Sequence, residues 1–259
     1  MRAGSALLKV GERLLAIQDD AFAAAWIDPA TRKVEPLVLR GPGQALDKQD
    51  KPDFEAAFAH ADRLWILGSG SRPNRCGIAR IDLNRRESVL LNALPMYGAI
   101  ARELGVTANI EGAVPLKDRL RLFQRGPGTS PKASYTIDVP LDVLDGAPPR
   151  VLDVVNYDLG VLQAVFLAFT DAVALGRHIV YLAVAEDTPD GIADGAITGA
   201  GVGILRDGGA HWDVLTEPDG SASKRKVEGI ALDAGGAWLL TDPDDPKKPA
   251  ELCRVEMKF

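Results

Sequence analysis

Four acidic residues recur along the chain at nearly constant intervals. Glu55, Glu111, Asp171 and Glu228 are separated by 56, 60 and 57 residues, and each opens a short apolar run. Ser5 takes the same position in an earlier run, 50 residues before Glu55. If the fold brings these carboxylates together, they repel one another, so either their pKa values rise or positive charge compensates them. Oxygen ligands of this kind suit Ca²⁺ or Mg²⁺ rather than zinc.

Basic residues lie in the segments that would meet these acids. They follow the second apolar run of two copies, at 72, 75 and 125, and form the run 224–226 just before Glu228. The candidate ligand-binding residues are therefore Glu55, Glu111, Asp171, Glu228, Arg72, Arg75 and Arg125. The candidate ligands of a Ca²⁺ or Mg²⁺ ion are Glu55, Glu111 and Glu228. In the alternative interpretation each acid is structural and accepts hydrogen bonds from backbone N–H groups of the adjacent repeat. No catalytic residue is assigned.

The last copy shows which elements position these acids. Apolar runs at 230–232 and 238–240 flank a Gly-bearing turn, the signal of a β-hairpin, and a third run follows a polar loop. The same layout recurs at 5–28, 55–82, 111–138 and 171–207. In four of the five copies, eight residues separate the acid or Ser5 from the start of the second run.

A repeat of about 50–60 residues made of short strands is typical of a β-propeller, whose four-stranded blades surround a central channel. Fourth strands are expected at 34–39, 88–92, 151–155 and 212–215, and the last copy ends without one. We therefore predict an all-β fold, a single β-propeller domain over residues 1–259 with five blades. Six blades are the alternative, because 158–170 is long and apolar enough to hold a further element.

The predicted meander places the acids at one end of the channel. The first strand of each blade lines the channel, and alternate loops of a meander lie at opposite ends. The acids should therefore share a face with the loops after the second strands and with the connections between blades. His60, His178 and His211 fall on the opposite face, which argues against a histidine-based centre at the channel mouth.

Composition excludes several classes of partner. The net charge is −6, the sequence pI is about 5.2, and no basic run is longer than 224–226, which argues against nucleic acid. No segment approaches the roughly 20 apolar residues of a membrane span, so we expect a cytoplasmic protein. A short helix is expected at 96–104, and 158–169 should form a helical turn or a buried connector. The acidic loops 187–195 and 242–245 lack the spacing of an EF-hand.

The acidic–Gly–apolar start of the first strand and the Arg-Gly-Pro at 125–127 resemble bacterial phytase-like and esterase-like β-propellers. The resemblance implies a site at the channel mouth, often with calcium held by acids, and hydrolysis of phosphoesters or related esters in some members. Glu55, Glu111 and Glu228 match that pattern. Asp171 is a shortened substitute, Ser5 departs from the pattern, and five blades are fewer than the six familiar in those families.

Three functions remain open on the sequence. The protein binds a small polar ligand at the acidic mouth, or it is a divalent-metal-dependent hydrolase of phosphoesters, esters or lactones, with metal-bound water as nucleophile and a Glu as base. The third is a protein-interaction scaffold, for which an exposed apolar patch at 96–104 or 159–167 would be the sign. The oligomeric state is left open.

Overall fold

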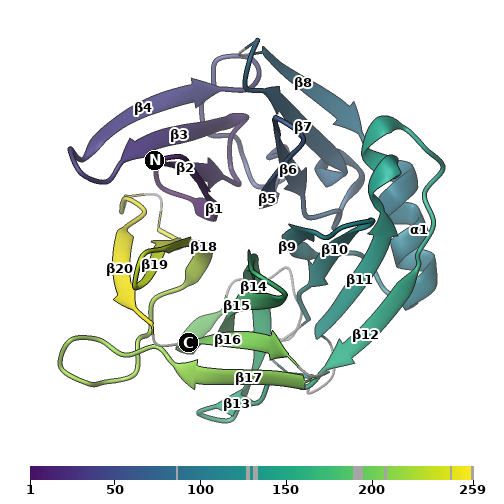
Figure 1. The fold of residues 1–259 in the computed structure, drawn as a ribbon. Helices are drawn as coiled ribbons and strands as arrows, with labels where there is room; N and C mark the ends of the chain where they lie inside the picture. The colour runs from purple at the N-terminus through teal and green to yellow at the C-terminus, as the bar shows by residue number, and fades with distance from the viewer. Residues whose placement is uncertain are drawn as a thin grey trace.

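Five antiparallel sheets stand around a central channel in the computed structural model, which describes residues 1–85, 87–126, 129–130, 134–188, 195–206, 209–245 and 247–257 (Figure 1). The sheets follow one another in chain order, and the inner strand of each contacts the inner strands of its neighbours. The predicted five-bladed β-propeller is confirmed.

Three blades are four-stranded meanders. Blade 1 consists of β1 (Gly4–Val10), β2 (Arg13–Gln18), β3 (Ala23–Asp28) and β4 (Lys33–Val38). Blade 2 consists of β5 (Phe54–His60), β6 (Arg63–Gly68), β7 (Gly77–Asp82) and β8 (Glu87–Asn92). Blade 3 consists of β9 (Ile110–Pro115), β10 (Arg119–Gln124), β11 (Ser134–Pro140) and β12 (Asp153–Tyr157).

The other two blades differ in strand number. Blade 4 has five strands: β13 (Val161–Leu162), β14 (Val165–Leu175), β15 (His178–Asp187), β16 (Ala196–Arg206) and β17 (Gly209–Val214). Blade 5 has three: β18 (Val227–Asp233), β19 (Gly236–Thr241) and β20 (Leu252–Glu256). The expected absence of a fourth strand in the last blade holds for the described residues. β12 begins two residues later than the sequence predicts. β17 begins three residues earlier than predicted.

Residues 158–170 belong to blade 4, so the six-bladed alternative is wrong. β13 and the start of β14 form a tight hairpin in which Val161 pairs with Phe166 and Leu162 with Val165. The segment is therefore neither a helical turn nor an irregular connector. Leu159 and Leu167 in this segment are buried against blade 3, in one cluster with Phe123. They reach blade 3 because the three long strands of blade 4 extend the sheet of blade 4 beside Phe123.

One α-helix, α1 (Leu94–Leu104), follows blade 2 and confirms the predicted helix at 96–104. Pro95 lies in its first turn, where the missing N–H costs nothing, and Gly105 ends it in the left-handed conformation with φ +69°. Met96, Tyr97 and Ile100 are buried in the cluster between blades 2 and 3. The helix therefore seals that junction at the edge of the ring (Figure 1).

The ring closes where β18 of blade 5 lies beside β1 of blade 1. Leu7 of β1 and Leu240 of β19 share one buried cluster, and Lys9 Nζ lies 2.5 Å from Asp233 Oδ1. Inner strands approach one another closely at this point, and Gly229 provides the room. Among the described residues no helix combines the length and the hydropathy of a membrane span.

Candidate functional site

A one-residue β-bulge lies in the inner strand of every blade, near the start of the strand in four blades and in the middle of β14 in blade 4, and it sets which side chain faces the channel mouth. The pairing of the inner strand with its neighbour skips one residue in each case. The skipped residues are Ser5, Glu55, Glu111, Thr170 and Glu228. In blade 4 the position belongs to Thr170 and not to Asp171. The predicted register is wrong by one residue there, because no spacing in the sequence reveals where a bulge falls.

Asp171 lies inside the ring, where it performs the structural role of the alternative interpretation. Its carboxylate accepts hydrogen bonds from the backbone N–H groups of Ala172 at 2.7 Å and Ile230 at 2.8 Å. Only 3% of the residue is exposed, and burial raises the pKa of the carboxyl group well above its ordinary value. Asp171 thus joins blade 4 to blade 5. Thr170 does the same through its hydroxyl, which donates to the carbonyl oxygen of Val227 at 2.7 Å.

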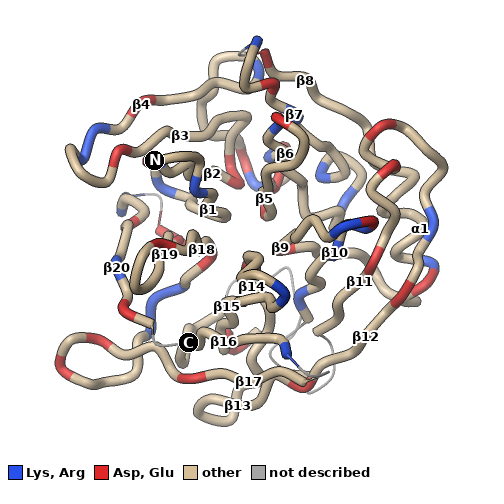
Figure 2. Tube along the Cα trace, in the orientation of Figure 1, with Lys and Arg blue, Asp and Glu red and all other residues tan. Residues whose placement is uncertain are grey.

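The three glutamates of the bulge positions line the channel mouth, where acidic positions of the inner strands lie near basic segments that adjoin them (Figure 2). They line a hollow that we call the channel-mouth hollow. Its described lining residues are Asp19, Lys48, Lys51, Asp53, Glu55, Arg75, Asn109, Glu111, Arg125, Glu186, Lys226, Glu228, Asp242 and Asp244. The hollow has a volume of about 70 Å³. On a scale where one water takes roughly 10–15 Å³, it has room for about five waters.

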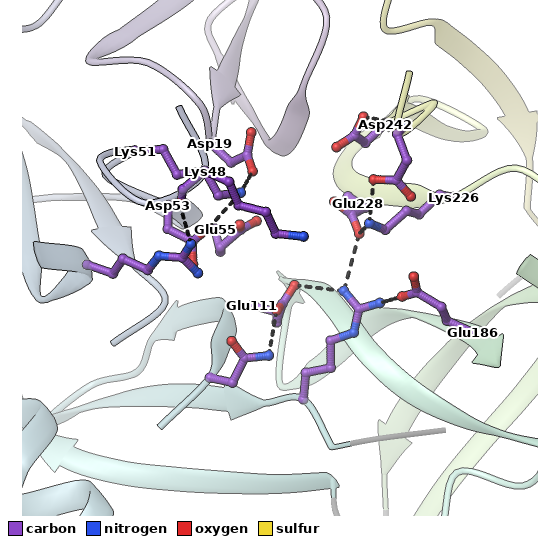
Figure 3. Close-up of a pocket in the computed structure, with 14 residues that line it drawn as sticks. Asp19, Lys48, Lys51, Asp53, Glu55, Glu111, Glu186, Lys226, Glu228 and Asp242 are labelled. Carbon is purple, nitrogen blue, oxygen red and sulfur yellow. Dashed lines mark hydrogen bonds and ion pairs between the residues drawn. The ribbon is translucent and has the colours of Figure 1, made fainter. Parts of the chain in front are cut away.

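Arg125, directly after β10, joins acids from three blades (Figure 3). One terminal nitrogen lies 3.2 Å from Glu111 Oε2 and 3.3 Å from Glu228 Oε1, and the other contacts Glu186. Burial opposes the charge on Arg125, but these carboxylates outweigh it and raise the pKa of the guanidinium. The Nζ of Lys226 extends the network, at 3.4 Å from Glu228 Oε1 and 2.9 Å from Asp244 Oδ1.

A second network lies across the hollow, around the ammonium group of Lys51. Its Nζ contacts Asp19 and lies 2.7 Å from Asp53 Oδ1, and Arg75 approaches Asp53 Oδ2 to 2.9 Å. Oxygens of Asp19, Asp53 and Glu55 all lie within 4.8 Å of one another. A divalent cation among these three would have to displace the Lys51 ammonium group. The predicted Ca²⁺ or Mg²⁺ ligands Glu55, Glu111 and Glu228 do not form such a group among the described residues. That site stays a prediction.

The cations do not fully compensate the acids of the hollow. Burial raises the pKa of Asp19 to about 6 and that of Glu111 to about 7, although Lys51 and Arg125 lower them. Burial and then the charge of Glu228 raise the pKa of Asp242 to about 8. The pKa of Glu55 is raised well above its ordinary value by burial and by Glu111. An environment that disfavours the ionised form of four carboxyl groups attracts further positive charge.

The structure brings together five of the seven predicted ligand-binding residues: Glu55, Glu111, Glu228, Arg75 and Arg125. Asp171 lies outside the hollow, as described above. Arg72 is exposed and lines a separate groove against α1, next to Tyr97 and Arg102. None of the three histidines lines the hollow. The acidic loop 242–245 reaches it through Asp242 and Asp244, whereas most of the loop 187–195 lies outside the described residues. Residues 127, 128, 131 and 132 of the loop after β10 are also outside them.

The hollow contains residues beyond the predicted ligand-binding set. Lys226 belongs to the basic run 224–226 that was expected to meet the acids, and the lining residues not predicted to bind the ligand are Asp19, Lys48, Lys51, Asp53, Asn109, Glu186, Asp242 and Asp244. The repeat does carry a signal for several of them. Asp19, Arg125 and Asp242 each come 14 residues after the bulge residue of their blade, whereas Asp53, Asn109 and Lys226 come two residues before it. These positions pair through backbone hydrogen bonds, such as Arg125 N to Asn109 O at 2.9 Å.

Comparison with known proteins agrees with this architecture. A model of a family of unknown function, DUF6929, matches residues 1–257. The chain belongs to this family. No curated protein sequence matches the chain.

Solved structures with the same fold share little sequence with this DUF6929 protein. A putative glycoside hydrolase from Bacteroides ovatus is 11% identical with a TM-score of 0.54, over 97% of this chain and 86% of that one. An exo-1,5-alpha-L-arabinanase from a bovine ruminal metagenomic library is 7% identical with a TM-score of 0.53, over 99% of this chain and 94% of that one. At these sequence identities the similarity to the two structures shows a shared fold.

Proposed function

We propose that the protein binds a small charged ligand in the channel-mouth hollow. The observation that carries this proposal is the charge of the lining, where eight carboxylates face five cationic side chains. Burying so many charged groups around a hollow costs stability, because the desolvation of each ion is only partly repaid by its partners. Groups with shifted pKa values that converge on a cavity are the usual mark of a functional site.

The second candidate is a divalent-metal-dependent hydrolase of phosphoesters, esters or lactones at the same place. The close approach of Asp19, Asp53 and Glu55 favours it, since three carboxylates within 4.8 Å could share a cation. The Lys51 ammonium group among them argues against it. Titration of Ca²⁺ and Mg²⁺ by calorimetry, with wild type and Glu111→Gln, tests this candidate. Micromolar binding that Glu111→Gln abolishes would favour the hydrolase and justify a screen of these esters.

The third function, an interaction scaffold, loses its expected support. Met96, Ile100, Leu159 and Leu167 are buried, whereas Val161 is 44% exposed. Burial of these four side chains leaves little apolar surface on the two segments for a partner.

A thermal-melt panel tests the binding proposal. Wild type is melted with small cations, zwitterions, anions and neutral polyols, and the affinity of any stabilising compound is measured by calorimetry. We expect one charged class to raise the Tm, and Lys48→Met, at the rim of the hollow, to change its Kd by about threefold, as exposed charges typically do. The matched control Arg72→Met removes an exposed cation from the separate groove and should leave the Kd unchanged. Stabilisation by no charged class would contradict the proposal.

A further inference from the structure

Glu55 differs from every other acid that lines the channel-mouth hollow. It is 8% exposed, yet among the described residues its carboxylate makes no hydrogen bond and no ion pair. Each of the other seven acids accepts at least one contact from a cation or a backbone N–H group. The residue is nine-tenths buried, but neither of its carboxylate oxygens is among the fully buried oxygens without a partner, so they reach the hollow. A carboxylate with no donor from the protein takes one from a molecule that it reaches. Glu55 lines the hollow, so a ligand there can supply the missing donor (Figure 3).

We propose that Glu55 anchors the ammonium group of a small primary amine, which makes the ligand class of the hollow primary amines and α-amino acids. This inference rests on the proposed function, since it specifies the ligand of the same hollow.

The chemistry of the lining favours a nitrogen cation over a metal ion at Glu55. Ca²⁺ requires six to eight oxygen ligands and Mg²⁺ requires an octahedral set. The neighbouring acids offer few oxygens for such a set: Asp19 Oδ1 has no hydrogen-bond partner among the described residues, but most of the others already accept from nitrogen. Both oxygens of Glu111 are engaged, Oε1 by Asn109 at 2.9 Å and Oε2 by Arg125 at 3.2 Å. Lys51 engages Asp19 and Asp53. An ammonium group needs only a few acceptors, and every other cation in the hollow is a nitrogen donor.

The electrostatics around Glu55 agree with a positively charged group. Burial raises the pKa of Glu55 most, and the charges of Glu111, Asp53 and Asp19 raise it further. The charge of Lys51 offsets only part of this effect. A bound ammonium group would offset this repulsion directly.

The size of the hollow and the position of Lys48 favour an amine that also carries a carboxylate. A volume of about 70 Å³, or roughly five waters, accommodates the main-chain atoms of an α-amino acid. Lys48 extends over the hollow from the connection between blades 1 and 2 (Figure 3). With the ammonium group at Glu55, the ligand carboxylate would lie on the side of Lys48.

Calorimetry with four small probes tests this assignment: glycine, ethylammonium, acetate and N,N,N-trimethylglycine. We expect glycine and ethylammonium to bind. N,N,N-trimethylglycine has the charges of glycine but no N–H donor, so it should bind about tenfold more weakly or worse. The variant Lys48→Met should bind glycine more weakly than wild type and should bind ethylammonium with unchanged affinity.

Glu55→Gln separates the role of the carboxylate from a role in folding. This variant keeps the shape of the side chain and removes an ionisable group whose charged form burial and the neighbouring acids disfavour, so its Tm should equal or exceed that of wild type. Its affinity for glycine and ethylammonium should fall by about tenfold or more.

Three results would overturn the assignment. Binding of acetate with no binding of either amine would leave the proposed function standing and remove Glu55 as an ammonium anchor. Binding of Ca²⁺ that Glu55→Gln abolishes, without amine binding, would replace the amine by a metal ion. If Glu55→Gln lowers the Tm and no probe binds, Glu55 is structural, and the charged panel described above then decides the proposed function separately.

Discussion

Arg125 is the residue on which the channel mouth depends most. Its guanidinium contacts acids from blades 3, 4 and 5, and only 8% of the residue is exposed. A planar guanidinium offers five donors in a fixed fork, so one side chain can serve three carboxylates that diverge from it. A lysine at this position would present a compact point charge and could not reach all three in the same way.

Replacement of this guanidinium should therefore be severe. Arg125→Met leaves Glu111, Glu186 and Glu228 buried without their shared partner, and we expect a loss of roughly 3–5 kcal/mol in the free energy of unfolding. Urea denaturation provides the measurement. The free energy of unfolding of Arg125→Lys should lie between those of Arg125→Met and wild type. Arg72→Met, at an exposed arginine, should stay within about 0.5 kcal/mol. An Arg125→Met variant as stable as wild type would mean that these acids do not need a cation in the folded state.

At the scale of the strand, the bulge and the glycine after it explain the repeated Glu-Gly pair. Glu111 and Glu228 occupy the bulge and face the mouth, and the next residue of each strand faces the backbone of a neighbouring inner strand. A Cβ at Gly112 would lie 3.0 Å from the nitrogen of Ala172. A Cβ at Gly229 would lie 2.8 Å from the nitrogen of Leu7. The pair therefore combines a site residue with a packing residue.

The packing half of the pair can be tested at the closure of the ring. Gly229→Ala would press a methyl group against the backbone of β1, and we expect it to cost roughly 1–3 kcal/mol, as overpacking typically does. Gly77→Ala is the matched control in β7, because its Cβ would meet nothing within 4 Å. That control should be neutral or slightly stabilising. Equal stability of the two variants in urea titrations would show that β18 and β1 can move apart at no cost.

The same strands show what the sequence could and could not reveal. Apolar runs and turn residues predicted the strands, the ring and the face of the site, because these follow from patterns within each copy. The mistake at Asp171 arose because a bulge moves every later side chain by one place, and nothing in the alternation marks where it falls. The acids and cations of the hollow could be predicted only in part from the sequence, because Lys51 and Lys48 come from a connection that has no equivalent in the repeat.

At the scale of the whole molecule, the ring gathers acids with raised pKa values at the channel mouth, whereas hydrogen bonding to the backbone lowers the pKa of exposed acids such as Asp82 and Asp245. Burial opposes the charges of Lys51, Arg125 and Lys226, but the neighbouring carboxylates outweigh it and raise the pKa values of these three cations, which therefore stay protonated between about pH 5 and about pH 9. The acids Asp19, Glu111 and Asp242 titrate in the folded state at about 6, 7 and 8, whereas in an unfolded chain they titrate near 4. Between about pH 4 and about pH 8 the folded state therefore binds more protons than the unfolded state. Stability must therefore fall as the pH rises through this window.

Asp242 should control the upper end of that fall. For wild type we expect the free energy of unfolding to decline by several kcal/mol between about pH 5 and about pH 9, because each of these acids contributes about 1.4 kcal/mol per pH unit until it has titrated in the folded state. Asp242→Asn keeps an acceptor for the backbone N–H of Asp244, which now donates to Asp242 Oδ1 at 2.9 Å, and it cannot ionise. The variant should lose most of the decline above about pH 7. Asp245→Asn, on the same loop, is the control, because hydrogen bonding to the backbone of Lys247 lowers the pKa of Asp245, so it titrates below this window. If urea titrations across this range give Asp242→Asn the slope of wild type, the burial of Asp242 does not govern the pH dependence, and Glu111 becomes the group to replace next.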